Sequence, residues 1–292
     1  GKRGLAGPHI VHIRTVTTDS VERDEFNQNI LAPIGSWLSR YSLQDSTLYI
    51  VLTKGVPLRV SGTEGQTGTV ASVDSELTLL YRRLLGLPSP LQGWVPNPYF
   101  LGERPIASAK PLTRGGSDIY LVTRLDGFTV ADTMKLVDRA SAPTRDGQVV
   151  LDQKATLIDR GGDAWLEEAA NRLRAAGGGV ALESTRAIAS AGGPIMGFFS
   201  WGSNDPANQR RRTGLQFAAG AIGGTFVSTD GRTFAEPPVD WTPSAPDGKG
   251  TLFAGGLSGR PTGGAAAPSD WRRSLPRRPG RPSIREGRQA WG

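Results

Sequence analysis

Residues 118–125 read DIYLVTRL and residues 195–201 read IMGFFSW, and these two stretches decide the expected fold. Each is a nearly continuous apolar run with β-branched and aromatic side chains, and each leads into a polar loop. Strands that are buried on both faces have this pattern, whereas strands with one wet face alternate apolar and polar residues. We therefore expect both stretches to be parallel strands of one sheet, with their polar ends gathered at a common edge.

Other short apolar runs extend this sheet along the chain. Strands are expected at residues 48–53, 56–60, 149–152, 179–183 and 225–229, and the chain opens inside an apparent strand, GPHIVHIRTV at 7–16. Segments with helical periodicity lie between these runs. This alternation predicts an α/β fold with a mostly parallel sheet that is covered by helices on both faces.

Three of the expected helices can be assigned an inward face. Their core-facing residues lie three or four positions apart and are Leu166, Ala170 and Leu173, then Val130, Met134 and Val137, and finally Phe26, Ile30, Ile34 and Trp37. We expect Asp163 to cap the first helix, and Thr129 with Asp132 to form a capping box on the second. Pro33 is expected to bend or interrupt the third helix.

Composition excludes several classes of function. The 292 residues contain no cysteine, which rules out disulfide scaffolds, thiolate metal sites and a cysteine nucleophile. The two histidines, His9 and His12, leave little material for histidine metal sites or acid–base chemistry. No apolar run approaches the roughly 20 residues that a membrane-spanning helix needs. The sequence therefore indicates no cofactor, no metal and no transmembrane segment.

The basic charge is concentrated at the C-terminal end. The formal net charge is +7, and residues 243–292 carry +6 of it from nine basic and three acidic residues. This segment is rich in Gly, Pro and Arg and lacks apolar periodicity, as disordered segments do. We expect one α/β domain over residues 1–242 and a disordered or non-native tail over residues 243–292. Nucleic-acid binding by the tail is the least favoured function.

The expected place for a site is the set of loops at the carboxyl ends of the strands. Small polar loops of this kind lie at residues 53–59, 71–76, 123–127 and 200–205. The candidate ligand-binding residues that they carry are Asp74, Arg124, Asp126, Trp201, Ser203, Asn204 and Asp205. Trp201 would supply an apolar anchor for a ligand, and the polar side chains would orient it.

Each candidate also has a structural interpretation that the sequence leaves open. Ser72 and Asp74 are placed to cap the helix that follows them. Arg124 and Asp126 are placed to form an ion pair at the edge of the sheet. The residues just before Pro206 favour a turn by composition alone.

Two sets of residues are candidates for a cation site and for a phosphate site. Asp74, Asp126 and Asp205 could jointly bind Ca²⁺ or Mg²⁺ if the fold brings their carboxylates together. Lys54 and Gly55 lack the glycine spacing of a phosphate loop, which argues against nucleotide binding there.

Five long motifs stand out between residues 49 and 234. They read YIVLTKGVPLRV at 49–60, ASVDSEL at 71–77, YLVTRLDGFTVADTMKLVDRA at 120–140, GFFSWGSND at 197–205 and FAAGAIGGTFVSTDGRTF at 217–234. Together they resemble an uncharacterised bacterial family found in genomes that carry the exosortase (PEP-CTERM) protein-sorting system. The resemblance implies no established activity. It implies a periplasmic or exported protein, although no signal peptide is visible in this chain.

The chain departs from that family at both ends. Members begin with a further strand and helix, and they continue beyond the PPVDWTP stretch at 237–243 with a helix and a closing strand. We therefore expect a chain truncated at both ends, with a frame-shifted or truncated tail. Such a chain would leave a strand edge or an apolar face uncovered.

The order of the motifs also resembles, more distantly, gingipain-type peptidases of the caspase-like fold. This resemblance implies a three-layer sandwich. It places the catalytic His position near Trp201 and Gly202 and the catalytic Cys position near Ser228, and neither catalytic residue is present. Asp205 and Ser228 are the remaining catalytic candidates, and Ser228 has no histidine to act as its base.

Two functions follow as hypotheses. The first is a noncatalytic binding or accessory protein of the bacterial envelope on a caspase-like scaffold, with a peptide or an envelope protein as its partner. The second is a peptidase-like hydrolase in which carboxylates such as Asp74 and Asp205 act as general acid and base. The sequence leaves open whether the chain is an enzyme and which oligomeric state it adopts.

Overall fold

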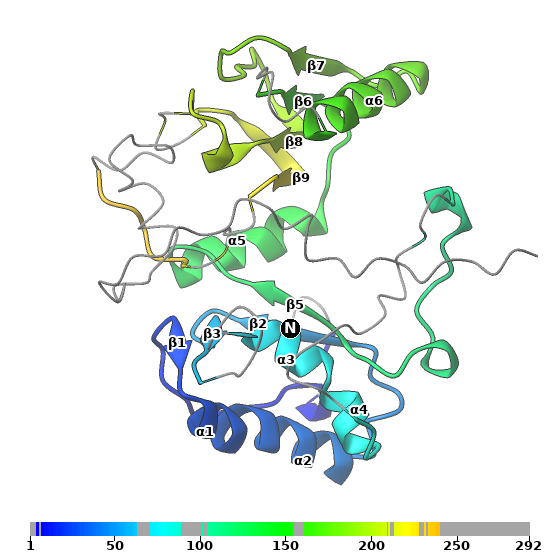
Figure 1. Ribbon diagram of the computed structural model, residues 1–292, viewed down its shortest axis with the longest axis vertical. Helices are drawn as coiled ribbons and strands as arrows, with labels where there is room; N and C mark the ends of the chain where they lie inside the picture. The colour runs from blue at the N-terminus through cyan, green and yellow to red at the C-terminus, as the bar shows by residue number, and fades with distance from the viewer. Residues whose placement is uncertain are drawn as a thin grey trace, which may run out of the picture. The chain divides into compact units, whose positions relative to one another are not determined.

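The computed structural model describes residues 4–5, 7–62, 71–88, 101, 104–154, 161–208, 210, 213–227, 231 and 233–239. These residues form an α/β fold in which mostly parallel strands pack against helices (Figure 1). The predicted tail at 243–292 and the candidate Ser228 lie outside the described residues. None of the helices in the described part combines the length and the apolarity that crossing a membrane requires.

The strands form three hydrogen-bonded sheets where one was expected. The two-stranded sheet pairs β2 (Tyr49–Thr53) with β5 (Leu121–Leu125) in parallel. The four-stranded sheet is parallel throughout and has the order β7 (Val180–Glu183), β6 (Gln148–Asp152), β8 (Ile195–Ser200), β9 (Phe217–Thr225). A three-stranded sheet of two-residue strands has the order β1 (Ser20–Val21), β3 (Arg59–Val60), β4 (Ala71–Ser72), and β4 runs antiparallel to β3.

Helices connect these strands. They are α1 (Arg23–Glu25), the π-helix η2 (Phe26–Leu31), α2 (Ala32–Arg40), α3 (Val73–Thr78), α4 (Leu80–Leu84), α5 (Val130–Ser141) and α6 (Gly161–Ala175). Short 3-10 turns lie at η1 (Gly7–His9), η3 (Ile106–Ser108), η4 (Arg114–Gly116) and η5 (Gly202–Asn204). The two stretches that decide the expected fold thus both form strands, but β5 and β8 belong to different sheets.

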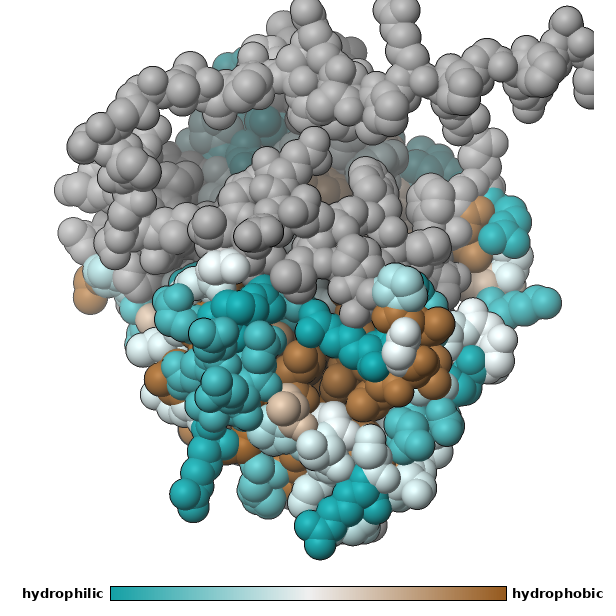
Figure 2. All heavy atoms as spheres, turned by 60° about the horizontal axis from the view of Figure 1, so that its bottom comes forward, coloured by the Kyte–Doolittle hydropathy of each residue, from teal (hydrophilic) through white to brown (hydrophobic). Residues whose placement is uncertain are grey.

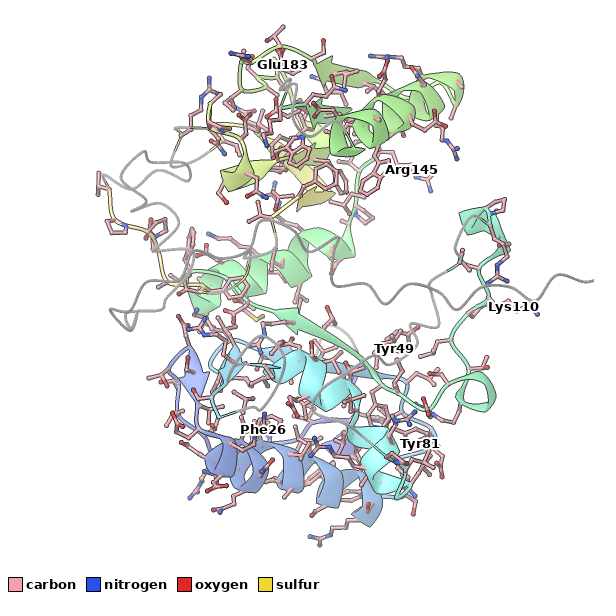
Figure 3. All side chains as sticks on the ribbon, viewed as in Figure 1. Phe26, Tyr49, Tyr81, Lys110, Arg145 and Glu183 are labelled. Atoms are coloured by element: carbon pink, nitrogen blue, oxygen red, sulfur yellow. The ribbon has the colours of Figure 1, made fainter. Side chains whose placement is uncertain are left out.

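The largest core lies between the first helices and the two-stranded sheet. Phe26, Ile30, Ile34 and Leu38 recur every four residues and are buried there, whereas the expected Trp37 is only half-buried. Figure 2 brings forward the part of Figure 1 where α1, α2 and α4 lie, and it shows apolar residues gathered among hydrophilic ones. In Figure 3 Phe26 lies on the strand-facing side of its helix.

A π-helical turn precedes Pro33, where a bend or an interruption of the helix was expected. The π-helix η2 ends at Leu31, and Pro33 is the second residue of α2. A proline ring inside a helix collides with the carbonyl group four residues earlier and leaves that carbonyl without a donor. The wider π turn relieves this collision by inserting an extra residue, so the helix continues through Pro33 instead of stopping.

The four-stranded sheet has a buried apolar cluster on each face of β6, but Phe199, Phe217 and Ile222 of β8 and β9 are exposed, so the continuous apolar runs predict the burial only in part. Leu151 of β6 packs with Leu166 and Ala170 of α6 on one face. Its neighbour Val150 packs with Ile195 on the other face. In the described residues this second face is covered by irregular segments that include Ala189, Ala191 and Leu215, where a helix was expected.

The strand expected at 225–229 begins eight residues earlier, as β9, and the described part ends it at Thr225. Glycines hide this strand from sequence patterns, because glycine weakens a strand by propensity. The structure requires two of them. A Cβ atom on Gly224 would lie 2.6 Å from the Phe199 ring, and one on Gly220, which has a positive φ, would lie 2.6 Å from Pro143.

Two other expected strands are largely absent. Residues 7–9 form the 3-10 turn η1, and residues 10–19 take part in no strand. Of the expected strand at 56–60, only Arg59 and Val60 pair with neighbouring strands. Both stretches have the apolar composition of a strand, but strand formation also needs a hydrogen-bonded neighbour in register.

The helix α5 begins where it was predicted, but the face that it buries is not the predicted one. The capping box between Thr129 and Asp132 is present in both directions. Val130 and Met134, which were expected to face inward, are 67 % and 51 % exposed, and the buried residue of this helix is Thr133. The cap is a local interaction, whereas the buried face depends on what packs against the helix.

Candidate functional site

The first group of predicted site residues surrounds Arg124 at the carboxyl end of β5. Arg124 Nη2 donates to Asp74 Oδ2 at 2.8 Å, and Arg124 Nη1 lies 3.7 Å from Asp126 Oδ2. The same guanidinium donates to the carbonyl oxygens of Val56 at 2.6 Å and Pro57 at 2.9 Å. The Arg124 side chain is only 9 % exposed, so these contacts use its donors inside the protein.

Neighbouring residues complete this ion-pair network. Lys54 Nζ donates to Asp126 Oδ1 at 3.2 Å and to the Gly127 carbonyl oxygen at 2.6 Å. Ser72 caps α3 by accepting a hydrogen bond from the Ser75 N–H. The network ties the loops that follow β2 and β5 to the start of α3. Ser72 caps that helix and Arg124 contacts Asp126, as the structural interpretation has it, whereas Asp74 pairs with Arg124 instead of capping.

This network also occupies the place that a shared cation would need. Asp74 and Asp126 both face the Arg124 guanidinium, which supplies the positive charge between them. Asp205 follows β8 of the four-stranded sheet and is not part of the Arg124 network. Within the described ranges, no group of three or more histidine or acidic side chains could hold a metal ion.

The second group lies at the carboxyl end of the four-stranded sheet. Asp163 Oδ1 accepts a hydrogen bond from Trp201 Nε1 at 2.7 Å and another from the Lys154 N–H at 2.9 Å. The Lys154 ammonium lies 4.8 Å from the centre of the Trp201 ring, in the geometry of a cation–π contact. These contacts join the segment after β6, the first turn of α6 and the loop after β8.

Asp163 therefore binds Trp201 and the Lys154 N–H, whereas the sequence predicted it as a helix cap. The helix α6 begins at Gly161, so Asp163 lies inside its first turn and is not the capping residue before it. The position nevertheless suits a carboxylate, because the helix dipole favours negative charge at this end. The carboxylate uses that position to hold Trp201, which is 7 % exposed and is therefore no open anchor for a ligand.

Two buried carboxyl groups lie in the same group. Asp152, the last residue of β6, and Asp205, after η5, are each 4 % exposed. Burial raises the pKa of Asp152 to about 6, and the negative charge of Asp205 adds to this rise, whereas the hydrogen bond from the Ala189 N–H opposes it. Burial also raises the pKa of Asp205, against the hydrogen bond from the Ala207 N–H and the charge of Lys154.

The turn expected before Pro206 is present and holds its own loop. The Asp205 N–H donates to the Gly202 carbonyl oxygen at 3.2 Å. The Asn204 amide donates to the Phe226 carbonyl oxygen, and the Asn208 amide donates to the Gly202 carbonyl oxygen at 3.1 Å. Ser203 is half-buried in the 3-10 turn η5. Asn204 and Asp205, which were expected to orient a ligand, thus form hydrogen bonds that stabilise their own loop.

Sequence reasoning missed Asp152 and Lys154 and misassigned Asp163. The signal for Asp152 was available, because it is the polar residue that ends the expected strand at 149–152. The same rule of strand ends had selected Arg124 and Asp205. Asp163 carried no such signal, since its contact with Trp201 joins residues that are 38 positions apart in the chain.

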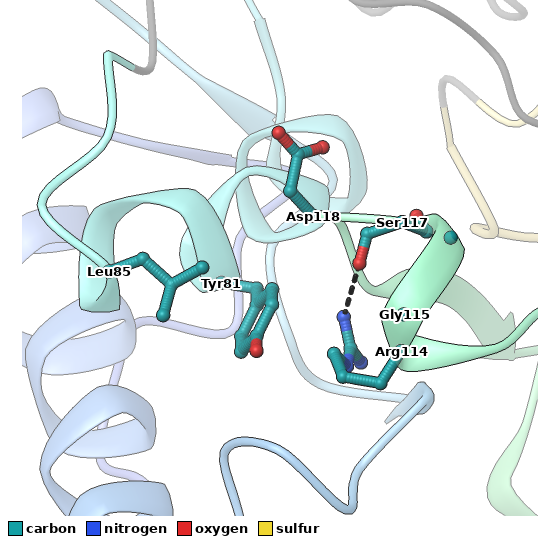
Figure 4. A pocket seen from close by; sticks show the side chains of 7 residues that line it. Tyr81, Leu85, Arg114, Gly115, Ser117 and Asp118 are labelled. Carbon is teal, nitrogen blue, oxygen red and sulfur yellow. Dashed lines mark hydrogen bonds between the residues drawn. The ribbon is translucent and has the colours of Figure 1, made fainter.

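A separate pocket of about 440 Å³ lies beside η4 and α4 (Figure 4). Figure 4 shows Tyr81 and Leu85 on one side of it and Arg114 with Ser117 on the other. The Arg114 guanidinium lies 4.0 Å from the Tyr81 ring centre and donates to the Ile119 carbonyl oxygen at 2.9 Å. Tyr81 Oη donates to Asp45 Oδ1 at 2.7 Å, which raises the pKa of Tyr81. Tyr81 Oη and Arg114 Nη1 thus already bind neighbouring groups, whereas the buried Arg114 Nε has no hydrogen-bond partner among the described residues.

Comparisons of the chain with protein-family models, with curated proteins and with solved structures give no match. The geometry described above is therefore the basis for a functional proposal.

Proposed function

We propose that this chain is a noncatalytic binding protein that holds a peptide segment against the loops at the carboxyl end of the four-stranded sheet. In this proposal the scaffold is the caspase-like sandwich that the motifs resemble, and the place of action is the bacterial envelope. The observation that carries the proposal is the double hydrogen bond to Asp163, which fixes the loops after β6 and β8 against each other.

Further bonds of the same kind support a pre-formed site. Asp152 Oδ1 accepts the Ala189 N–H at 3.1 Å and so fastens the loop after β7 to the end of β6. Loops that are already ordered lose less conformational entropy when a ligand binds, and this raises affinity without new contacts. Exposed polar side chains lie on these loops, among them Arg186, and also Asn204 and Thr185, which already bond to the Phe226 carbonyl oxygen and to Glu183. They suit the main-chain amides and the side chains of a peptide.

The test uses the full chain immobilised against a random peptide display library. Peptides that bind the wild type are then measured against Asp163→Ala, which releases Trp201 and the Lys154 N–H. We expect at least a tenfold loss of affinity, equivalent to about 1.4 kcal/mol.

The matched control is Glu167→Ala, which removes an exposed carboxylate one turn further along α6. It should bind as the wild type does, and circular dichroism should show both variants folded. Recovery of no peptide by the wild type, or equal affinity in both variants, would remove the proposal.

A hydrolase is the second candidate, and one observation favours it. Asp152 and Asp205 are buried carboxyl groups whose pKa values are both raised, and the pKa of about 6 lets Asp152 exchange a proton near neutral pH. A panel of peptide and ester substrates tests this candidate. Turnover with a pH profile that shifts in Asp152→Asn would support it, and an inert wild type would eliminate it.

A further inference from the structure

The pocket beside η4 and α4 is lined by an arginine whose charge is not paired (Figure 4). Within the part of the chain that the structure describes, no acidic side chain forms an ion pair with Arg114, whereas the nearby Arg82 and Arg83 are each paired with a carboxylate. Arg114 is half-buried, so water solvates its charge only in part. Charges that are removed from water are normally paired, and this one is therefore open to an anionic ligand.

Neutral groups hold the Arg114 guanidinium in one orientation. Its Nη1 donates to the carbonyl oxygens of Ser117 at 3.3 Å and Ile119 at 2.9 Å. Its Nη2 donates to the Thr47 carbonyl oxygen. The guanidinium carbon lies 4.0 Å from the centre of the Tyr81 ring. Carbonyl dipoles and an aromatic face attract the cation, but they carry no net charge that would neutralise it. The pocket thus presents a positioned cation that lacks a counter-ion.

These contacts leave part of the hydrogen-bonding capacity of Arg114 unused. A guanidinium has more N–H groups than these three bonds to carbonyl oxygens employ, and Nε is buried without a partner. A buried donor of a charged group that lacks an acceptor costs free energy. Because the positive charge is delocalised over the whole guanidinium, an anion beside the part that lines the pocket compensates the charge even where Nε itself is enclosed.

The other polar side chains of the pocket do not cancel this charge. Asp118 lines the pocket, but its carboxylate binds Arg82 Nη1. Arg82 and Arg114 against Asp118 leave an excess of one positive charge. Ser117 Oγ accepts a hydrogen bond from the Ile119 N–H at 3.4 Å, so its own proton is available to a ligand. The pocket therefore offers a cation and a hydroxyl donor to an anion.

The opposite side of the pocket is apolar. Figure 4 shows Tyr81 and Leu85 there, and Leu85, just after α4, is 47 % exposed. No side chain covers the pocket at Gly115, and a Cβ atom added at this position would meet no atom within 4 Å. The volume of about 440 Å³ lies in the range of pockets that hold small molecules. A charged group facing an apolar wall suits a small ligand with one ionised and one apolar end.

We infer that this pocket binds a small organic acid, whose carboxylate pairs with Arg114 and whose apolar body lies against Tyr81 and Leu85. The Ser117 hydroxyl group donates a further hydrogen bond to the carboxylate. A monocarboxylate matches the single excess positive charge, whereas a phosphate group would bring a second negative charge close to Asp118. None of these residues belongs to the loops of the four-stranded sheet, so the site does not depend on the proposed peptide binding.

The probes are benzoate and hexanoate, with benzamide and hexanamide as uncharged counterparts of the same shape and inorganic phosphate as a competing anion. Each probe is titrated into the full chain at neutral pH and followed by the amide chemical shifts in NMR spectra. We expect at least one acid to give saturable shifts at Gly115 and Ser117. The matching amide should bind at least tenfold more weakly, because it lacks the charge that pairs with Arg114. Inorganic phosphate should bind more weakly than that acid.

Two variants place the carboxylate without disturbing Arg114, which also holds three backbone carbonyl groups. Leu85→Glu puts a negative charge into the wall of the pocket, and Leu85→Gln has the same size without the charge. Leu85 is largely exposed, so both variants should fold, and circular dichroism checks this. We expect Leu85→Gln to bind the acid within about threefold of the wild type and Leu85→Glu to bind it at least tenfold more weakly.

The comparison of acid with amide needs only the wild type and decides the matter even if a variant does not fold. The inference is overturned if neither acid binds, if an amide binds as tightly as its acid, or if phosphate binds more tightly than both acids. It is also overturned if folded Leu85→Glu and Leu85→Gln bind the acid equally well, or if the shifts leave Gly115 and Ser117 unchanged, since the carboxylate then lies elsewhere.

Discussion

The two sheets that are parallel throughout differ in how the acidic residues at their carboxyl ends are stabilised. At the end of β5, Asp74 and Asp126 surround one guanidinium, and the charges are paired. At the end of the four-stranded sheet, Asp152 and Asp205 are buried and each accepts a hydrogen bond from a backbone N–H. Burial raises the pKa of both carboxyl groups. The same topological position thus holds a structural ion pair in one sheet and acids under electrostatic strain in the other.

The apolar cores differ in the same sense. The core beside the two-stranded sheet is a single large cluster that includes the fully buried Phe26, Ile30 and Tyr120. The four-stranded sheet has a thin cluster on each face, centred on Val150 and on Leu151. The two sheets therefore differ in the size of their apolar cores as well as in how their acidic residues are stabilised. Four substitutions test this difference, from the largest expected effect to the smallest.

Arg124→Ala should have the largest effect. It leaves Asp74 without its cation, Asp126 with Lys54 alone and two carbonyl oxygens without a donor, and breaking a buried pair in this way costs about 3–5 kcal/mol. The free energy of unfolding in urea measures this loss. Arg186→Ala, an exposed arginine, is the control and should change it by less than about 0.5 kcal/mol. A loss below about 1 kcal/mol in Arg124→Ala would mean that the ion pairs are not structural.

Asp152→Asn should show the strain in the four-stranded sheet as a dependence on pH. The carboxyl group has a pKa of about 6 in the folded chain and a reference value of 3.8. Between these values the folded state binds more protons than the unfolded state, so the wild type loses stability as the pH rises, by on the order of 2–3 kcal/mol in all.

The asparagine variant lacks this loss and keeps an acceptor for the Ala189 N–H. Its stability relative to the wild type should therefore rise from pH 4 to about pH 6 and stay level above pH 7. Urea unfolding at four pH values within this range provides the measurement. A relative stability that is the same at every pH would show that Asp152 is not strained.

Gly162→Ala tests how closely α6 packs on the loop after β8. A Cβ atom at this position would lie 2.6 Å from the Trp201 ring and 3.2 Å from the Phe226 ring. We expect a loss of about 1–3 kcal/mol, because overpacking outweighs the better helix propensity of alanine. Gly161→Ala has no atom within 4 Å of the new Cβ and should be neutral or slightly stabilising. Equal effects of the two substitutions would contradict the close approach of Trp201 to α6.

Thr129→Ala should have the smallest effect, about 1 kcal/mol, because it removes one side of the capping box of α5. Thr129→Ser retains the hydroxyl group and should keep most of the stability. Thermal unfolding followed by circular dichroism compares the two. The expectation fails if serine and alanine at this position are equally unstable.

Much of the fold could be predicted because its causes are local. Continuous apolar runs predict the strands at 49–53, 148–152 and 195–200, and Thr129 with Asp132 predicts the start of α5. The strand β9 could not be found in this way, since Gly220 and Gly224 are there to let Pro143 and Phe199 approach. These close contacts join glycines to residues that are distant in the chain, so a local sequence pattern does not reveal them.

The candidate site divides along the same line. Strand ends selected Arg124, Asp126 and Asp205 as candidates, and these residues do lie at or just after the ends of β5 and β8; the same rule would have selected Asp152. The partner of each of these residues was not visible, because Arg124 and Asp74 are 50 positions apart and Trp201 and Asp163 are 38 positions apart. Ser228 stays a prediction, since it lies outside the described residues.

The amino-acid sequence by itself determined the α/β class, the positions of most strands and helices, and the caps of α3 and α5, because periodicity and capping act within a few residues. Tertiary structure alone decided that β5 and β8 enter different sheets, that Val130 and Met134 face outward, and which acids are paired and which are strained. These outcomes depend on burial and on charges brought together across the chain, and both quantities exist only once the chain has folded.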